Sequence, residues 1–307
     1  MAANRLLVLG AVFAISGLAA QAVASDMIYT QYDRSSHNHI WKLNSSGVNV
    51  QLTDGNASDI WPSYSLDGKS IAFQRNAVGA QVWTMNSDGT GLRSVTSGAH
   101  CDEMPSFLPN GTKMLYFEQN NCGSLIPHTQ IQIMNLDGSG RTVVFPPSFD
   151  THYYIEPRMN PQGTKIVFAG DDHSDGSNQI FVVNADGTGY TQLTTQASPG
   201  VVSGDPYWSP DGTKIVMSHR DASGNINVWR MNNDGTGLTQ LTNFIEPLEA
   251  GDAAYSQDGS QIWFELDNGG NGQSIPWVPA SPFAMNPDGS GIGPTGISCA
   301  SVNCSPR

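Results

Sequence analysis

A turn motif, Asn-x-Asp-Gly-(Thr/Ser)-Gly, constrains the fold of this chain more than any other sequence feature. It begins at Asn86, Asn135, Asn184, Asn232 and Asn286, with a weaker copy at Asn44. The aspartates of the five strong copies stand 48 to 54 residues apart. Each interval also holds a second turn and apolar runs for four short strands. A repeat of about 40 to 50 residues with four strands indicates a β-propeller. Six copies therefore predict an all-β, six-bladed β-propeller with four antiparallel strands per blade.

A large side chain stands three residues before the asparagine of each repeat, which indicates packing between blades. The six residues are Trp41, Trp83, Gln132, Phe181, Trp229 and Phe283. A sheet that is covered on both faces carries large side chains rather than a clean alternation of apolar and polar residues. These six positions therefore suit blades that pack between two neighbours. Gln132 is the exception.

The two ends of the chain predict an exported protein whose ring is closed by its C-terminal segment. Residues 1–24 combine Arg5, an apolar run and the small residues 22–24, the pattern of a secretory signal peptide cleaved after Ala24 or Ser25. Residues 25–307 are then the propeller. They open on MIYTQYD, which matches the second strand of later repeats, while residues 296–302 follow the last turn with nothing of their own to pair with. We expect this C-terminal segment to supply the missing innermost strand, because that removes an exposed sheet edge. The alternative is an incomplete first blade and a C-terminal tail.

Charge and cysteine content narrow the classes of function. The chain has 27 acidic and 14 basic residues, a net charge of −13. Such a balance argues against a nucleic-acid partner, since phosphate binding needs a basic face. No stretch after the signal peptide is apolar enough to cross a bilayer, so we expect a soluble periplasmic or secreted monomer. Four cysteines in an exported chain favour disulfides, and of the three possible pairings we favour Cys101 with Cys122 and Cys299 with Cys304.

Five strand-and-turn segments resemble the WD40-like (PD40) repeats of TolB-type six-bladed propellers. They are SYSLDGKSIAF, SFLPNGTKMLYF, RMNPQGTKIVFA, YWSPDGTKIVM and YSQDGSQIWF, and the resemblance covers nearly all of residues 27–291. It is specific for the fold and not for an activity. TolB-type proteins carry an α/β domain before the propeller, whereas here the propeller is expected directly after the signal peptide. The resemblance implies a periplasmic or secreted propeller that binds another protein, or a secreted enzyme of the propeller-type lyase kind.

Propeller geometry sorts the polar residues onto two faces. The connections between blades and between the two middle strands of a blade share one face, here called the loop face. Both Asp-Gly turns of each blade lie on the other, the turn face. All seven histidines are expected on the loop face: His37, His39, His100, His128, His152, His173 and His219. Loops are polar as a rule, so this grouping is explained equally well by longer loops or by a ligand site.

Carboxylates add to the case for a ligand site on the loop face. They stand just before the innermost strand of five blades and are expected to ring the mouth of the central channel: Asp59, Asp102 with Glu103, Glu156, Asp205 and Asp252. Each of them singly is also suited to capping backbone amides. The aromatic pair Tyr153 and Tyr154 beside His152 suits a sugar ring.

Candidates for catalysis and metal binding are few. The chain has no G-x-S-x-G, H-E-x-x-H or P-loop motif. A lyase would draw its base from His100, His152 or His219 and would orient a substrate carboxylate with Arg158 or Arg220. The run Asp171, Asp172 and Asp175 resembles a weak calcium site, although His173 and Val182 stand where a calcium loop needs ligands and a solvated loop explains the run as well.

Two functions remain open from the sequence. The first, which we favour, is a binding module that contacts a protein partner or cationic ligand through its acidic, histidine-bearing face. The second is a secreted glycan-active enzyme, a metal-assisted lyase of uronate-containing chains, with a divalent cation such as calcium as cofactor.

Overall fold

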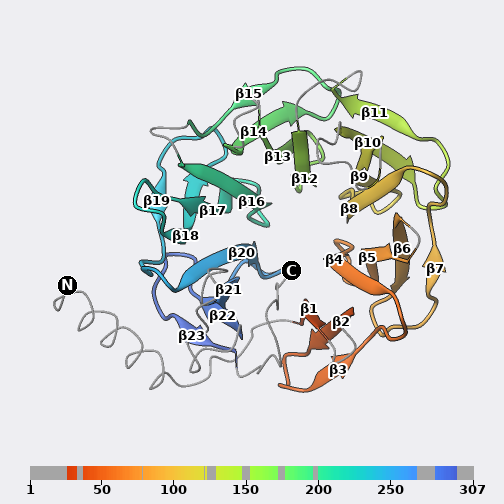
Figure 1. Ribbon diagram of the computed structural model, residues 1–307, viewed down its shortest axis with the longest axis horizontal. Coiled ribbons are helices and arrows are strands. Elements are labelled where there is room, and N and C mark those ends of the chain that lie inside the picture. The colour runs from red at the N-terminus through yellow and green to blue at the C-terminus, as the bar shows by residue number, and fades with distance from the viewer. Residues whose placement is uncertain are drawn as a thin grey trace.

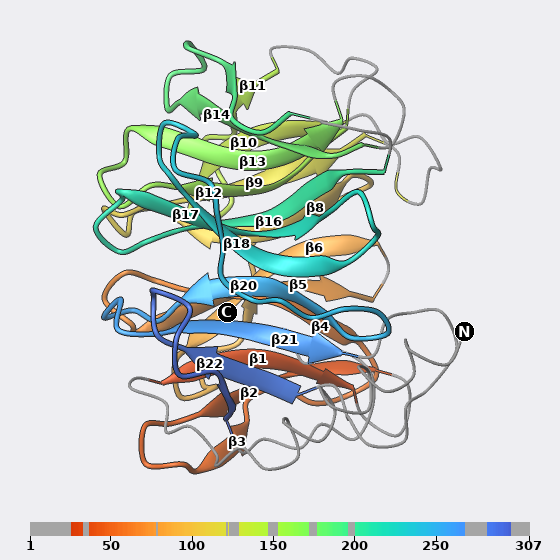
Figure 2. The same cartoon turned by 90° about the vertical axis from the view of Figure 1, so that its left-hand side faces the viewer.

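A computed structural model describes residues 26–32, 37–77, 79–120, 122, 129–146, 153–171, 177–195, 200–267 and 281–295. Within these residues every regular element is a β-strand, and the strands form six antiparallel sheets around a central axis (Figure 1). The side view shows strands running across the thickness of the ring (Figure 2). The six-bladed propeller predicted from the turn motif is confirmed.

Each sheet uses consecutive strands, ordered from the channel outward. The first contains β1 (Met27–Tyr32), β2 (Asn38–Leu43) and β3 (Asn49–Gln51); the second β4 (Ser58–Tyr64), β5 (Ser70–Asn76), β6 (Ala80–Asn86) and β7 (Arg93–Ser94). The third contains β8 (Cys101–Phe107), β9 (Lys113–Gln119), β10 (Thr129–Asn135) and β11 (Thr142–Phe145); the fourth β12 (Tyr153–Met159), β13 (Lys165–Asp171), β14 (Gln179–Asn184) and β15 (Thr191–Gln192). The fifth contains β16 (Val202–Trp208), β17 (Lys214–Arg220), β18 (Ile226–Asn232) and β19 (Thr239–Gln240); the sixth β20 (Glu249–Tyr255), β21 (Ile262–Asp267), β22 (Ser281–Met285) and β23 (Gly293–Pro294).

The repeated motif forms the outer turn of each blade and also fixes the neighbouring blade. In the fifth blade the Asn232 carbonyl accepts from the Gly235 amide at 3.0 Å, and the Asp234 carboxylate accepts from the amide and hydroxyl of Thr236. In the five strong copies, the glycine that follows the aspartate has a positive φ and also lies against a backbone carbonyl of the preceding blade. A Cβ at Gly187 would lie 2.5 Å from the Val144 oxygen. Glycine is therefore required at this position for two reasons: the positive φ and the close approach of the neighbouring carbonyl.

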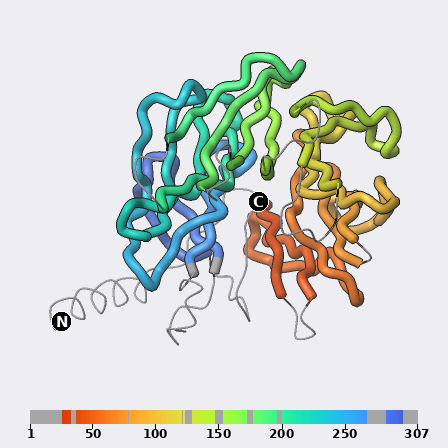
Figure 3. Tube along the Cα trace, turned by 45° about the horizontal axis from the view of Figure 1, so that its top comes forward, coloured from red at the N-terminus to blue at the C-terminus, as the bar shows by residue number. Residues whose placement is uncertain are grey.

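The hydrophobic core is divided into six clusters, one at each junction between adjacent sheets. The row of large residues lies at these junctions as expected, and the exception, Gln132, is buried and accepts a hydrogen bond from the Tyr116 hydroxyl at 2.9 Å. One cluster joins Met27 and Tyr29 of the first sheet to Trp263 of the sixth. The Cα trace shows these two sheets, coloured red and blue, as neighbours around the ring (Figure 3). The ring is thus closed by packing. The first sheet has three described strands, and residues 296–302, expected to add a fourth, lie outside the described residues.

Candidate functional site

Five innermost strands share a β-bulge at the channel wall. The register shifts at the same place in β4, β8, β12, β16 and β20. The first bulge residue has a left-handed backbone in every case: Trp61, Met104, Glu156, Asp205 and Asp252, with φ between 48 and 58°. The next residue is proline in the first four of these strands and Ala253 in the last. The predicted acids therefore lie inside the strands rather than before them, and only three of them occupy the bulge itself.

Side chains of one blade bind the bulge amide of the next blade. Glu156 Oε2 accepts from the Asp205 amide at 2.6 Å, and Ser218 Oγ accepts from the Asp252 amide at 3.0 Å. In the same way, Gln74 Oε1 accepts from the Met104 amide at 3.3 Å. Ser218 Oγ also donates to Asp205 Oδ2 at 2.8 Å, so the fourth, fifth and sixth blades share one hydrogen-bonded chain. Glu156 caps a backbone amide, although that amide belongs to the neighbouring blade.

Asp59 and Asp102 are held in buried ion pairs. The Asp59 carboxylate is 0% exposed and makes two hydrogen bonds, of 2.6 and 2.7 Å, with Arg75. Asp102 pairs with Arg141 at 3.0 Å, and Arg141 also reaches Glu118 at 3.4 Å. Burial raises the pKa of the Asp102 carboxyl, and the Arg141 charge opposes this shift. Both acids thus tie strands together within their own blades.

Glu103 and the two tyrosines belong to different environments. Burial raises the pKa of the Glu103 carboxyl, while a 3.3 Å hydrogen bond from Gln74 lowers it. Tyr153 has its pKa raised to about 12, first by burial and then by the charges of Glu103 and Glu156, so these three groups are neighbours. Tyr154 is 2% exposed and meets the rings of Phe145 and Phe168 edge-on. Tyr154 is therefore part of the core, and the pair does not form one aromatic surface.

A cavity of about 310 Å³ lies on the channel side between the fifth and sixth blades. Four carboxylate residues line it, together with Arg220: Asp205, Glu249, Asp252 and Glu265. Asp205 and Asp252 come from the bulges of β16 and β20. We call this cavity the acidic pocket. It brings together two of the predicted acids and two that the sequence analysis missed, Glu249 and Glu265.

Two glycines, each directly before a bulge acid, border the acidic pocket. Gly204 and Gly251 line the cavity, whereas the equivalent residues of the second and fourth blades are Ile60 and Ile155. A Cβ at Gly204 would meet only Glu156 Oε2, at 3.9 Å, so the space in front of it is open. The Gly-Asp dipeptides at 204–205 and 251–252 were the available sequence signal for this cavity.

The catalytic candidates are distributed over different surfaces. Ser218 and Arg220 line the acidic pocket, so His219 between them points to the opposite face of β17. There its Nδ1 lies 2.8 Å from Ser203 Oγ and its ring meets Trp229, and burial lowers its pKa. His100 is exposed before β8, and His152 lies outside the described residues.

Arg158 occupies yet another place. It is buried at 4% exposure, follows the bulge of β12, and lines a cavity at the opposite end of the channel, on the turn face. The structure therefore places Arg158 and Arg220, the two arginine candidates, in different cavities.

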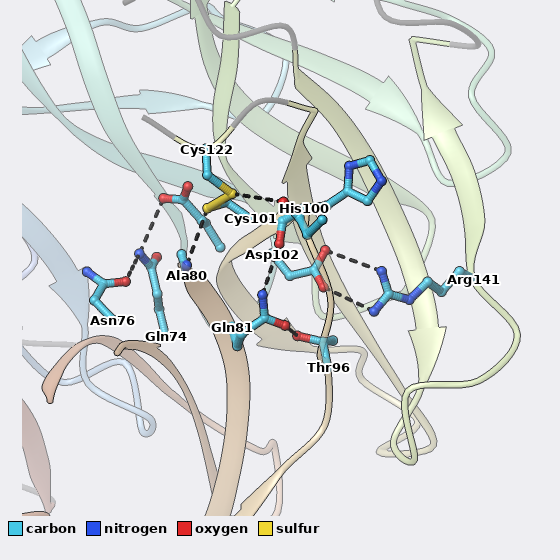
Figure 4. The surroundings of a disulfide bond; sticks show 12 residues. Gln74, Asn76, Ala80, Gln81, Thr96, His100, Cys101, Asp102, Cys122 and Arg141 are labelled. Carbon is cyan, nitrogen blue, oxygen red and sulfur yellow. Dashed lines mark hydrogen bonds and ion pairs between the residues drawn. A yellow bond between two sulfur atoms is a disulfide. The ribbon is translucent and has the colours of Figure 1, made fainter. Parts of the chain in front are cut away.

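The Cys101–Cys122 disulfide is present as predicted, with a Cα–Cα distance of 5.4 Å (Figure 4). The two cysteines belong to one blade and not to neighbouring blades: Cys101 opens β8, and Cys122 follows β9 of the same sheet. The neighbouring blade contributes the Ala80 amide, 3.3 Å from Cys101 Sγ. Cys299 and Cys304 lie outside the described residues.

No three His, Cys, Asp or Glu side chains within the described ranges converge as a metal site. Asp171 ends β13 and is 8% exposed, while Asp172, His173 and Asp175 lie outside those ranges. The calcium site suggested by this run therefore lies mostly outside the described residues and stays a prediction.

The family model for the TolB beta propeller domain (PD40) matches residues 23–199, more than half of the chain. The chain belongs to this family. Among curated relatives of this TolB-family propeller, the uncharacterized protein Atu1656 of Agrobacterium fabrum (strain C58 / ATCC 33970) is 26% identical over 130 residues. That match covers 40% of this chain and 44% of the relative, so the chain spans less than half the length of the curated relative it matches.

Solved structures show the same fold at low sequence identity. TolB from Acinetobacter baumannii superposes on this TolB-family propeller with a TM-score of 0.69 at 20% identity, covering 98% of this chain and 68% of that one. An oligogalacturonate lyase in complex with manganese gives a TM-score of 0.61 at 16% identity, covering 88% and 73%. Within the described residues no helix is long and apolar enough to cross a membrane.

Proposed function

We propose that this chain is an exported, TolB-like binding module that takes a basic segment of a protein partner, or another cationic ligand, in its acidic pocket. The observation that carries the proposal is the cavity between the fifth and sixth blades, lined by four carboxylate residues and a single arginine. Carboxylates gathered in a concave, partly desolvated place concentrate positive charge and strengthen its binding. Export is supported by the signal-peptide pattern of residues 1–24 and by the family.

The bulge makes the acidic pocket rigid. Two of its acids, Asp205 and Asp252, have backbone amides bound by the preceding blade, and Ser218 connects them. Groups fixed before a ligand arrives lose little conformational entropy on binding. This favours a recognition site.

The lyase alternative requires a base and a carboxylate-orienting arginine at one cavity. Among the described candidates, His219 and Arg220 point to opposite faces of β17, and Arg158 lines the other end of the channel. The likeness to oligogalacturonate lyase is a likeness of fold. The described geometry thus gives more support to binding than to catalysis.

The test uses the mature protein and a fluorescein-labelled peptide of alternating lysine and alanine. Glu249→Gln with Asp252→Asn removes two charges from the acidic pocket, and asparagine tolerates the left-handed backbone at position 252. Gly204→Ile installs the side chain that other blades carry there and fills the cavity without changing charge. We expect each variant to weaken binding by about tenfold or more.

The control is Glu246→Gln, which removes one charge from an exposed residue outside the acidic pocket. It should bind the peptide like the parent protein. Binding that is insensitive to Gly204→Ile would overturn the proposal. Histidine-dependent release of unsaturated product from uronate polysaccharides, assayed in parallel, would support the lyase instead.

A further inference from the structure

The opposite end of the channel carries a second cavity, of about 140 Å³, on the turn face. The innermost strands of the second to sixth blades all contribute to it where they run into their first Asp-Gly-type turns. Five aromatic residues are part of its lining: Tyr64, Phe107, Tyr207, Trp208 and Tyr255. We call it the turn-face pocket. It shares no lining residue with the acidic pocket.

The turn-face pocket carries a positive charge, opposite in sign to the charge of the acidic pocket. Arg158 is the one charged side chain among the described residues that line it. Its guanidinium lies 5.9 Å from the centre of the Tyr207 ring, and its own carbonyl accepts from the Trp208 indole at 2.9 Å. A guanidinium in an aromatic, largely desolvated place attracts a carboxylate far more strongly than one in water.

The serine hydroxyls beside Arg158 are directed toward the rim of the pocket. Ser65 donates to Asp67, Ser209 to Asp211 and Ser256 to Asp258. Each aspartate also accepts from a backbone amide of its own turn. The turn acids are thus held at the rim by local bonds, and Arg158 sets the charge inside.

A groove of about 350 Å³ continues from the turn-face pocket across the second and third blades. The two cavities share Ser65, Leu66, Phe107 and Pro109. Leu66, 65% exposed, stands on the border between them, and Leu136 lies farther along the groove. The one charged residue among the groove's lining is Asp67, 3.7 Å from Lys69. A groove with Leu66, Phe107, Pro109 and Leu136 in its lining that leads to a buried cation suits an extended chain rather than a free ion.

We propose that the turn face is a second docking site, which takes an extended polypeptide segment of a partner with an acidic side chain on Arg158 and an apolar side chain over Leu66 and Phe107. The two mouths of the channel then select ligands of opposite charge. This site goes beyond the function proposed for the acidic pocket and is independent of it.

The probe is a pool of fluorescein-labelled nonapeptides with glutamate fixed at the centre and a mixture of alanine, leucine, isoleucine, proline and serine around it. A matched pool carries glutamine at the centre. We expect the full chain to retain the glutamate pool about tenfold better than the glutamine pool. Leu66→Glu should weaken retention about tenfold, and Leu238→Glu, at another exposed leucine, should leave it unchanged.

Arg158→Met should abolish the preference for glutamate while circular dichroism shows the fold intact. If that variant does not fold, Leu66→Glu still tests the proposal, because it changes an exposed side chain. Equal retention of the two pools, or retention unaffected by Leu66→Glu, would overturn the proposal. Competition by phosphate or by galacturonate as strong as that by the glutamate pool would overturn it too, because the site would then be one for small anions.

Discussion

Aspartate performs three separate tasks in this ring, and its position in the blade decides which. In the outer turns, Asp234 and its equivalents accept hydrogen bonds from their own Thr or Ser. In the innermost strand β4, the buried Asp59 carboxylate pairs with Arg75. At the bulge, Asp205 and Asp252 border an open cavity. Removing an acid is therefore expected to affect acid stability, global stability or binding, according to its place.

The buried pair makes the first prediction at this scale. Arg75→Met leaves the Asp59 carboxylate at 0% exposure without its bidentate partner, and we expect the free energy of unfolding to fall by about 3 kcal/mol. Urea denaturation followed by tryptophan fluorescence measures the change. Lys69→Met, which breaks the exposed pair with Asp67, should leave the free energy of unfolding unchanged. A tolerated Arg75→Met would show that the pair contributes little.

The sequence predicted that these acids lie close to the innermost strands, but not what each one does. Asp59 and Asp252 stand in similar places in their repeats. Their roles differ because Asp59 has Arg75 as its cross-strand partner, whereas Asp252 follows Gly251 at a bulge. A bulge shifts the register by one residue and so changes which side chains face the channel. This shift was not readable from residue spacing.

At the scale of the element, turns were the most predictable part of the chain and strand interiors the least. Asn-x-Asp-Gly-(Thr/Ser)-Gly specifies its conformation locally, through hydrogen bonds between residues two to four positions apart. Bulges and cavities depend on contacts between blades, and the spacing of residues in the sequence does not reveal these contacts.

The turn aspartates give a prediction for acid stability. Hydrogen bonds from Thr or Ser hydroxyls, and then from backbone amides, lower the pKa of Asp88, Asp137, Asp186 and Asp234 below the ordinary 3.8. A lowered carboxyl pKa stabilises the fold above the ordinary value, and that stability is lost as pH falls through the lowered one. Replacing all four with asparagine should flatten the loss of stability below pH 3.8.

Thermal denaturation followed from about pH 5 down to about pH 2.5 measures this effect. Asp54→Asn provides the control, since this aspartate is exposed and lies outside the turns. An acid profile of the fourfold variant that matches the parent would contradict the argument.

For the whole molecule, closure of the ring is partly established and partly open to test. The first and sixth sheets pack against each other through Met27, Tyr29 and Trp263. Whether residues 296–302 also add an innermost strand to the first sheet stays a prediction. The order of blades was predictable from the repeat, because each blade follows its predecessor around the ring.

Deletion of residues 296–307 tests that strand. If the segment pairs with β1, its loss exposes a sheet edge, and we expect the melting temperature to fall by more than about 10 °C. Differential scanning calorimetry of the mature protein and the shortened form compares them. A shortened form that melts with the parent would identify the segment as a tail.

In the five strong copies of the motif, the contact between the glycine after the aspartate and a carbonyl of the preceding blade makes five junctions of the ring head-to-tail. Gly187 lies over Val144 as Gly235 lies over Leu193 and Gly289 over Leu241. A blade copied by tandem duplication of its gene segment therefore arrives with a fitting surface for both of its new neighbours. Insertion of such a blade into the ring would need no new interface, because the same glycine–carbonyl contact would form on both of its sides.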